Sequence, residues 1–402
     1  MRVLWLTREA PYPPRYGGDY LYSSHLIEAL AAAGASVCVL CSPGGGVSPA
    51  KQSREPSVEW EVLPAAPERP AWRSLFGPLP SIAARYVAEG MRRRVTHEVA
   101  AGAWDAVCID HIGMAWLLPV VRRARGHRRR PLLVYIAHNH EKSVRAQLAR
   151  EAPGGLPRRA ALRVDAWKAG RLEDALTRQV DLLVANTEVD DDRYRSDHPE
   201  VPSVVVRPAY EGPALDPADP ASRPRRVVVA GSFGWLAKQL NLDAFLAEAA
   251  LRLAEAGVEL EVAGAMPPDY ERTVRARFPA VRLTGTLDDL TPHLAEARVG
   301  VVPEYVGGGF KHKALQYVFC RVPILALAGS VAGTPLVPGR SILESPDMRT
   351  LVDGILDVID DAPRLASIEA AAFEACRDEF RWADRGVTLR DALARRLAEA
   401  PA

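Results

Sequence analysis

The stretch Gly307-Gly308-Gly309-Phe310-Lys311-His312-Lys313 joins an apolar segment, residues 299–303, to the helical pattern Ala314-Leu315-Gln316-Tyr317-Val318-Phe319. A strand, a glycine-rich loop and a helix in this order form one unit of a parallel α/β sheet. The glycines let the backbone approach a ligand closely, and the helix directs unpaired N–H groups and the positive end of its dipole at the loop. Two lysines add positive charge. The stretch therefore predicts a phosphate or diphosphate site, and the alternative is a glycine-rich turn with two solvated lysines.

The alternation of strand and helix continues outward from this stretch. Around it, apolar strand patterns occur at residues 226–230, 259–263, 281–283, 299–302 and 323–327, with a helical pattern over 242–256. Towards the N-terminus, a helical pattern covers 20–33, and strand patterns occur at residues 2–6, 36–41, 106–109, 132–137 and 182–185. Each series predicts a parallel sheet with helices on both faces.

A segment rich in proline, aspartate and alanine, residues 213–226, separates the two series and predicts an interdomain linker. We therefore expect an α/β protein with two Rossmann-like domains, residues 1–212 and 227–377. The tail, residues 378–402, contains Phe380-Arg381-Trp382 and an amphipathic pattern, which predicts a helix that returns to the first domain. A chain of 402 residues is too long for one compact core, which agrees with this division.

The composition is that of a soluble globular protein and narrows the function classes. Hydrophobic residues make up 48% of the chain and charged residues 25%, and the formal net charge is +1. This balance argues against nucleic-acid binding, which usually needs a marked basic excess. The longest apolar runs are too short to span a bilayer, and residues 1–7 predict a core strand and not a signal peptide. We expect a protein of the reducing cytoplasm with five buried thiols, at Cys38, Cys41, Cys108, Cys320 and Cys376.

Five groups of residues, in consistent order along nearly the whole chain, resemble motifs of the GT-B glycosyltransferases, in particular the family-4-like bacterial group 1 members. The groups are Pro14-Arg15-Tyr16-Gly17-Gly18, Ala137-His138-Asn139-His140-Glu141, Val229-Ala230-Gly231-Ser232-Phe233-Gly234-Trp235, the pair Val262-Ala263-Gly264 and Leu283-Thr284-Gly285-Thr286-Leu287, and the stretch from Gly307 to Lys313. The resemblance implies two domains that face a central cleft. It also implies transfer of a sugar from a nucleoside diphosphate sugar to a small-molecule or saccharide acceptor, with retention of anomeric configuration.

The resemblance also assigns the donor site. Breaking the glycosidic C–O bond leaves negative charge on the diphosphate, and fixed positive groups aimed at that charge lower the barrier. Lys311 and Lys313 are the candidates, with Lys238 as a third. The remaining donor-binding candidates are Gly17, Gly18, Gly231, Ser232, Gly264, Thr286, Leu287, Gly308, Gly309, Phe310 and Gln316.

The chain departs from the family pattern at three donor positions. Gln316 and Gly308 stand where relatives carry glutamates that hold the ribose, and Ser232 stands where many carry arginine. Glutamine forms hydrogen bonds without the strength that a charge adds. The departures weaken the expected ribose contact and leave the diphosphate contact intact. The base of the donor, UDP or GDP, its sugar and the acceptor are not readable from these residues.

In the first domain, Gly17 and Gly18 follow the first strand, where a loop backbone could reach the diphosphate; the alternative is a simple proline–glycine turn. The resemblance assigns His138 to the donor sugar, and the alternative is a structural histidine. The acceptor candidates are His111, Asn139, His140, Glu141 and Glu304, and we expect loops at residues 75–80 and 144–159 to add acceptor contacts. His140 and Glu141 could instead form the general base of an inverting enzyme, as could Asp110 with His111. Glu304 could equally be a solvated loop acid.

Two charge clusters remain. Asp190-Asp191-Asp192 could bind a metal ion, but it follows Asn186-Thr187-Glu188 and predicts the first turn of a helix, where acids meet the dipole favourably. The family works without a metal, and we expect no metal and no cofactor. The basic runs at residues 92–94 and 122–130 could bind an anionic membrane surface, although the preferred interpretation is that they are solvated helix ends.

Two other function classes stay open. A non-hydrolysing sugar-nucleotide epimerase also has two Rossmann-like domains, but it needs acids and histidines around the cleft, and carboxylates are few near the glycine loops. A catalytically silent sugar-nucleotide-binding protein is compatible with Gln316.

Overall fold

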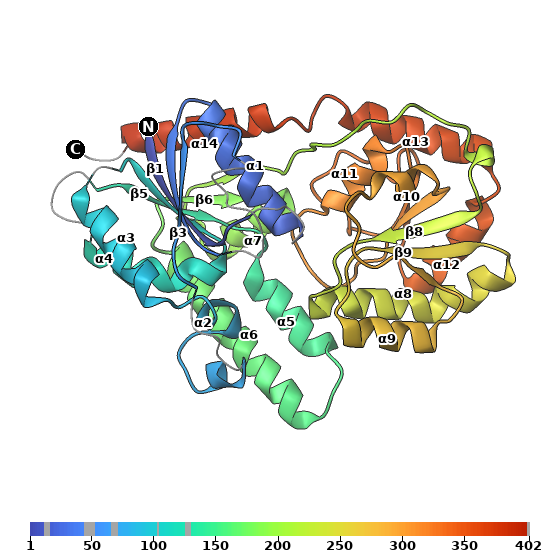
Figure 1. Ribbon diagram of the computed structural model, residues 1–402, viewed down its shortest axis with the longest axis horizontal. Helices are drawn as coiled ribbons and strands as arrows, with labels where there is room; N and C mark the ends of the chain where they lie inside the picture. The colour runs from blue at the N-terminus through green and yellow to red at the C-terminus, as the bar shows by residue number, and fades with distance from the viewer. Residues whose placement is uncertain (12–16, 44–52, 66–70, 103, 125–129, 400–402) are drawn as a thin grey trace. The chain divides into compact units, whose positions relative to one another are not determined.

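The computed structural model describes residues 1–11, 17–43, 53–65, 71–102, 104–124 and 130–399 (Figure 1). The chain divides into two compact units. The first contains Met1–Pro208 and Trp382–Ala402, and the second contains Ala209–Arg381. Residues 213–226, expected to form a linker, thus belong to the second unit. There the N–H of Leu215 donates to the carbonyl of Phe319 at 2.9 Å.

The first unit is built on a seven-stranded parallel sheet in the order β3-β2-β1-β4-β5-β6-β7. The strand order reverses between β1 and β4, and such a switch point places a ligand site at the carboxyl ends of the strands. The strands are β1 (Arg2–Glu9), β2 (Ser36–Ser42), β3 (Val58–Val62), β4 (Ala106–Asp110), β5 (Leu132–Ile136), β6 (Leu182–Ala185) and β7 (Ser203–Val205).

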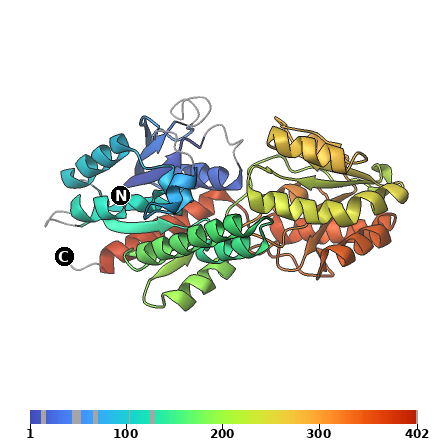
Figure 2. The ribbon, with the colours of Figure 1, turned by 90° about the horizontal axis from the view of Figure 1, so that it is seen from below.

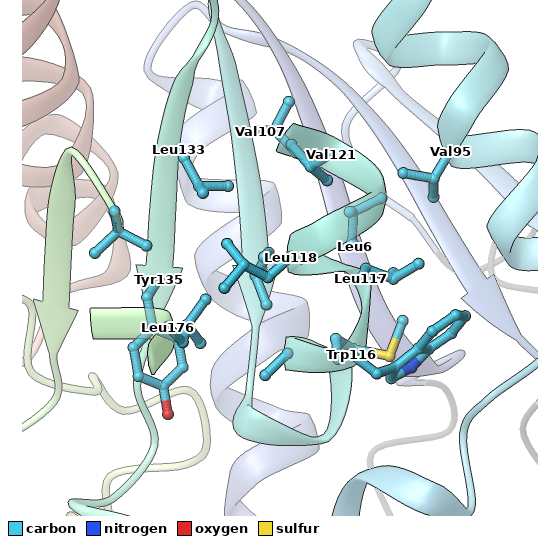
Figure 3. Packing of buried hydrophobic residues seen from close by; sticks show 14 of the residues in the cluster. Leu6, Val95, Val107, Trp116, Leu117, Leu118, Val121, Leu133, Tyr135 and Leu176 are labelled. Carbon is cyan, nitrogen blue, oxygen red and sulfur yellow. The ribbon is translucent and has the colours of Figure 1, made fainter. Parts of the chain in front are cut away.

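Helices cover both faces of this sheet because successive strand residues point to opposite sides. Leu4 and Leu6 pack on one side with Val95, Val121 and other residues of a first core, part of which Figure 3 shows. The neighbouring Val3 and Trp5 pack on the other side with α1 and α14. The helices are α1 (Gly18–Ala32), α2 (Ser81–Ala84), α3 (Glu89–Ala101), α4 (Leu118–Ala124), α5 (Glu141–Glu151), α6 (Leu156–Thr177), α7 (Glu188–Asp197) and α14 (Trp382–Glu399), with 3₁₀ helices η3 (Ala71–Leu75) and η4 (Ile112–Leu117).

The C-terminal helix α14 returns to the first unit, as the tail sequence predicts. It lies against α1, where a Cβ placed on Gly386 would stand 2.0 Å from the carbonyl oxygen of Ala29. Trp382 stacks on His25 with ring centres 5.0 Å apart. Only glycine allows the two helices to approach this closely.

The second unit repeats the architecture with a six-stranded parallel sheet in the order β10-β9-β8-β11-β12-β13. Its switch point lies between β8 and β11. The strands are β8 (Arg226–Ala230), β9 (Glu259–Ala263), β10 (Arg282–Leu283), β11 (Val299–Val302), β12 (Ile324–Leu327) and β13 (Leu343–Ser345). The helices are α8 (Leu236–Glu255), α9 (Pro268–Arg277), α10 (Thr291–Ala295), α11 (His312–Phe319), α12 (Met348–Val358) and α13 (Ala362–Cys376), with the 3₁₀ helix η5 (Pro220–Ser222).

The two parallel sheets with their helices confirm the predicted α/β fold of two Rossmann-like domains. One local prediction was wrong, because residues 144–159 are mostly helical and do not form a loop. They form most of α5 and the start of α6, which lie side by side as a hairpin (Figure 2). The short strands β3, β7 and β13 were not predicted. They are only partly buried, so they lack the continuous apolar runs that mark the central strands.

Candidate active site

Three lysines surround one buried carboxylate at the switch point of the second sheet. Glu304 follows β11, and its side chain is 3% exposed. Lys238, from the first turn of α8, places its Nζ 2.6 Å and 2.7 Å from the two carboxylate oxygens. Lys313, from α11, places its Nζ 2.7 Å from Oε1, and the Nζ of Lys311 is 3.6 Å from Oε2. The interpretation of Glu304 as a solvated loop acid is therefore wrong.

The electrostatics of this lysine–Glu304 cluster keep Glu304 ionised. Burial by itself would raise the pKa of the Glu304 carboxyl, but the charges of Lys238, Lys313 and Lys311 outweigh it and hold the pKa well below its ordinary value. Burial lowers the pKa of Lys313; Glu304 opposes that shift, and Lys238 adds to it. One carboxylate and three ammonium groups leave the cluster with a net charge of about +2.

The loop that carries Glu304 is held in place by Asn241 of α8. Its side-chain oxygen accepts hydrogen bonds from the N–H groups of Tyr305 and Val306, at 3.1 and 2.9 Å, and its amide donates to the carbonyl of Val306 at 2.8 Å. Asn241 is 2% exposed. The sequence interpretation missed this residue, although a lone Asn among the apolar positions of a helix is a usable signal for a buried hydrogen-bonding role.

Two further contacts bring the strand ends together. The hydroxyl of Tyr317, on α11, accepts a hydrogen bond from the N–H of Ala230 at 2.8 Å, so α11 is fastened to the end of β8. A Cβ on Gly264 would stand 1.9 Å from the carbonyl oxygen of Gly231, and Gly264 has φ 131°. Gly264 therefore permits the close approach of the loops after β8 and β9, a role that the donor-site prediction did not include.

The glycine loop turns sharply into α11. Gly307 and Gly309 have φ values of 129° and 65°, which favour glycine. The Nζ of Lys311 donates to the carbonyl of Gly309 at 3.1 Å and also to that of Gly308, so this ammonium group closes the loop on itself. Phe310 is buried and touches Phe380 with ring centres 5.9 Å apart.

The other predicted donor residues of the second unit lie at the same edge of its sheet or near it. A Cβ on Gly231 would lie 3.7 Å from the Nζ of Lys313, which puts the loop after β8 beside the lysine–Glu304 cluster. Ser232 and Thr286 are exposed, and Leu287 and Gln316 are half-buried. The structure thus brings Lys238, Glu304, Lys311, Lys313 and Gly231 together.

In the first unit, His138 and Asp110 form a buried pair at the ends of β5 and β4. The Nε2 of His138 lies 2.6 Å from Oδ1 of Asp110, whose other oxygen accepts from the indole N–H of Trp5 at 3.0 Å. Burial would raise the pKa of Asp110, but His138 and these hydrogen bonds hold it below its ordinary value. The Nδ1 of His138 is buried without a partner among the described residues.

His111 stands beside this pair, with its ring centre 5.4 Å from that of His138. Its backbone is left-handed, at φ 74°, and its Nδ1 accepts from the N–H of Gly113 at 2.9 Å. Burial, together with nearby Arg8 and His138, lowers the pKa of His111 well below its ordinary value, so the ring is neutral. Gly17, with φ 121°, is the N-cap of α1, and Gly18 is the first residue of that helix. Pro14, Arg15 and Tyr16 of the same motif lie outside the described residues.

His140, Glu141 and Asn139 are engaged with neighbouring side chains. His140 places Nδ1 2.7 Å from the hydroxyl of Ser143 and Nε2 3.4 Å from Asp197. Glu141 accepts from Asn139 at 2.9 Å and from the Nε of Arg145 at 3.0 Å. These contacts lie at the start of α5. They also engage one of the two residue pairs that could serve as a base in an inverting mechanism.

The remaining clusters have structural partners. Asp190 and Asp191 lie in the first turn of α7, as predicted, and the hydroxyl of Thr187 caps that turn by accepting from the N–H of Asp190. Across the described part of the chain, no group of three or more His, Cys, Asp or Glu side chains is arranged to hold a metal ion. All five cysteines are buried and free.

The first basic run is paired with acids, since Arg92 and Arg93 contact Glu89, and Arg94 contacts Glu61. Arg122 donates to Gln179, whereas residues 125–129 of the second run lie outside the described residues. No helix in the described ranges is both long and apolar enough to cross a bilayer.

Comparison with known proteins agrees with this architecture. Residues 17–236 match the family model described as "Glycosyl transferase 4-like domain", and residues 224–361 match "Glycosyl transferases group 1". No curated protein sequence matches the chain significantly.

Solved structures share the fold. The sucrose-phosphate synthase of Thermosynechococcus elongatus has a TM-score of 0.72 at 16% identity, with 100% of both chains covered. Anabaena HepE in complex with UDP and glucose has a TM-score of 0.68 at 15% identity, again with 100% of both chains covered. WaaG, described as a glycosyltransferase involved in lipopolysaccharide biosynthesis, has a TM-score of 0.66 at 15% identity, with 97% of this chain and 99% of the WaaG chain covered. With a 4-like family model matching more than half of its length and two Rossmann-like units of the GT-B fold, the chain belongs to the group 1, 4-like glycosyltransferases.

Proposed function

We propose that this glycosyltransferase transfers a sugar from a nucleoside diphosphate sugar to a hydroxyl group of an acceptor, with retention of configuration and without a resident metal ion. The observation that carries the proposal is the lysine–Glu304 cluster at the switch point of the second sheet. A buried site of about +2 charge beside the N-terminus of α11 fits the charge of a diphosphate group. That HepE is described in complex with UDP-glucose supports the same donor class.

The cluster would act on the leaving group. As the bond between the anomeric carbon and the diphosphate oxygen breaks, negative charge grows on that oxygen and its phosphate. Lys238 and Lys313 are fixed by Glu304 before the donor arrives, so little side-chain reorganisation is needed when the charge develops. Lys311 keeps the glycine loop in shape through its bonds to the carbonyls of Gly308 and Gly309. These positive groups supply the charge that a metal ion would otherwise provide.

Retention is supported by the state of the residues in the first unit. An inverting reaction requires a protein base opposite the leaving group, but His140 and Glu141 are both held by hydrogen bonds to neighbours. In the other candidate pair, Asp110 is held by His138 and Trp5, and the Nδ1 of His111 by the N–H of Gly113. In a retaining transfer on one face of the sugar, the departing phosphate oxygen itself can accept the proton of the acceptor hydroxyl. The unpartnered Nδ1 of His138 could then bind a sugar hydroxyl.

A donor screen tests the proposal. The protein is incubated with UDP-, GDP- and dTDP-sugars, and nucleotide release and thermal protection are measured. Lys313→Ala and Lys238→Ala should each lower turnover about 10²–10³-fold, as loss of one fixed positive group in a transition-state site typically does. Lys142→Ala, which removes a lysine bound to Asp174 and Asp197 in the first unit, is the matched control.

The outcomes separate the function classes. Sugar transfer that both cluster variants reduce and the control leaves unchanged supports the proposal. Donor binding without turnover would indicate a catalytically silent binding protein. Recovery of the nucleotide sugar with one stereocentre of the sugar inverted would indicate an epimerase. Near wild-type turnover in Lys313→Ala would remove the leaving-group role.

A further inference from the structure

Helix α6 carries an apolar stripe that faces solvent. Leu156, Ala160, Val164 and Trp167 recur at helical spacing, and all four are exposed; Leu156 is 81% exposed and Trp167 60%. The buried residues of α6 lie on another side of the helix and near its end, at Ala169, Gly170, Glu173, Leu176 and Thr177. An apolar stripe normally faces the core, and an exposed one marks a binding surface.

Two aromatic side chains lie beside this helix, on the segment that contains η3. Phe76 is 84% exposed and Trp72 is 58% exposed, and their rings meet edge to face with centres 6.2 Å apart. Lys168 of α6 fastens the segment, because its Nζ donates at 2.6–2.8 Å to the carbonyls of Ser74, Leu75 and Gly77. Figure 1 shows the short blue helix η3 beside α6, in green.

Arginines surround these apolar groups without acidic partners. The guanidinium of Arg171 lies 4.9 Å from the ring centre of Trp167, and that of Arg73 lies 5.8 Å from that of Trp72. A groove of about 510 Å³ runs between α5 and α6 beside Trp167. Among the residues that the structure describes, no ion pair is formed by the exposed arginines Arg73, Arg150, Arg158, Arg159, Arg163 and Arg171.

The acids near this surface do not neutralise it. Asp165, on α6, accepts from the N–H and hydroxyl of Ser81 and lies 3.7 Å from Arg145. Asp174 is engaged by Lys142. The surface is therefore positive and apolar at once, in contrast to Arg92 and Arg93 of α3, which are paired with Glu89.

We propose that the η3–α6 surface, defined as Trp72, Arg73, Phe76 and the exposed face of α6 from Leu156 to Arg171, docks on an anionic lipid bilayer. Protruding tryptophan, phenylalanine and leucine side chains enter the headgroup region, and the arginines bind lipid phosphates. A second copy of the chain is a poorer occupant, because a two-fold contact would press the same unpaired arginines against each other.

Vesicle co-sedimentation of the full chain tests this proposal. Vesicles of phosphatidylcholine alone are compared with vesicles that also contain phosphatidylglycerol. The wild-type protein should bind the anionic vesicles, and its affinity should fall as salt rises. In the double variant Arg159→Glu/Arg163→Glu, each removed positive charge should weaken binding about fivefold, which corresponds to ~1 kcal/mol. Trp167→Ser and Phe76→Ser should also weaken it.

Two controls distinguish binding through this surface from non-specific effects of net charge and of exposed apolar side chains. Arg92→Glu/Arg93→Glu changes the net charge equally but on α3, and Leu251→Ser removes an apolar side chain that is 69% exposed on α8. Both should bind vesicles as wild type does, and melting temperatures should show that every variant is folded. The substituted side chains are exposed, so folding should survive.

The proposal is overturned if wild-type protein fails to bind anionic vesicles, if neutral vesicles bind as well, or if Arg159→Glu/Arg163→Glu binds as wild type does. Sedimentation velocity without vesicles gives a further check. A dimer that these same substitutions dissolve would assign the surface to a second copy and would also overturn the proposal.

Discussion

Replacing Glu304 by Gln tests whether the lysine–Glu304 cluster is held together by the buried charge. Glutamine keeps the shape of the side chain and removes its charge. The carboxylate lies 2.6 Å from the Nζ of Lys238 and 2.7 Å from that of Lys313, and its side chain is 3% exposed. Removing one partner of such a buried pair leaves uncompensated charge, which costs about 3–5 kcal/mol of stability.

The loss should depend on pH in a defined direction. The pKa of Glu304 is held well below its ordinary value in the folded protein. The stability that the Glu304 carboxylate adds to the wild-type protein is therefore fully present above the unfolded pKa of about 4.3. It disappears as pH falls through the lower pKa of the folded protein. At high pH, the variant loses the carboxylate that raises the pKa of Lys313, so its alkaline activity limb should move to lower pH.

The appropriate assay is hydrogen exchange at increasing urea concentrations, followed in peptides that cover β8 and β11. It reports the stability of the second unit by itself, which matters because a two-unit chain need not unfold in one step. The control is Glu259→Gln, which removes a glutamate that pairs with Arg226 and Arg282 but is 38% exposed. This control should lose much less stability. Equal losses in both variants, or a Glu304→Gln deficit that stays constant to pH 3, would refute the electrostatic reasoning.

Three other substitutions test the framework. Gly264→Ala should destabilise the second unit by at least about 1–3 kcal/mol in urea unfolding, because its Cβ would overlap the Gly231 carbonyl at a positive φ; wild-type stability would contradict the close approach. Asp110→Asn should lower stability in urea, because it removes the buried charge paired with His138, and should lower the kcat of the folded protein about 10²-fold by releasing His138; an unchanged kcat would remove His138 from the reaction. Gly386→Ala should lower the melting temperature by forcing α14 off α1, and limited proteolysis should then cleave α14 sooner; equal cleavage would contradict this packing.

The fold was largely predictable because its central strands are buried on both faces. Such strands need continuous apolar runs, and residues such as Val227, Val228 and Val229 provide them. The edge strand β7, Ser203–Val205, is short and half-buried, so its sequence carries no comparable signal. Helix α6 was missed in part because its first half is exposed and rich in arginine, without a buried face that sequence periodicity could reveal.

The site was predictable only in its parts. The glycine loop and its lysines identified a phosphate-binding element from local sequence alone, because glycine backbone freedom and helix polarity are local properties. The partners of those lysines are not local. Lys238 and Glu304 lie 66 positions apart, and no spacing rule connects them.

The sequence by itself determined the alternation of strands and helices, the glycine loop and the membership of a sugar-transferring family. Only the tertiary structure decided that Glu304 is a buried counter-ion for three lysines and not a solvated acid. The reason is topological. The strand order places β11 beside β8, so the loops after these strands meet at one edge, and their side chains share a largely buried space.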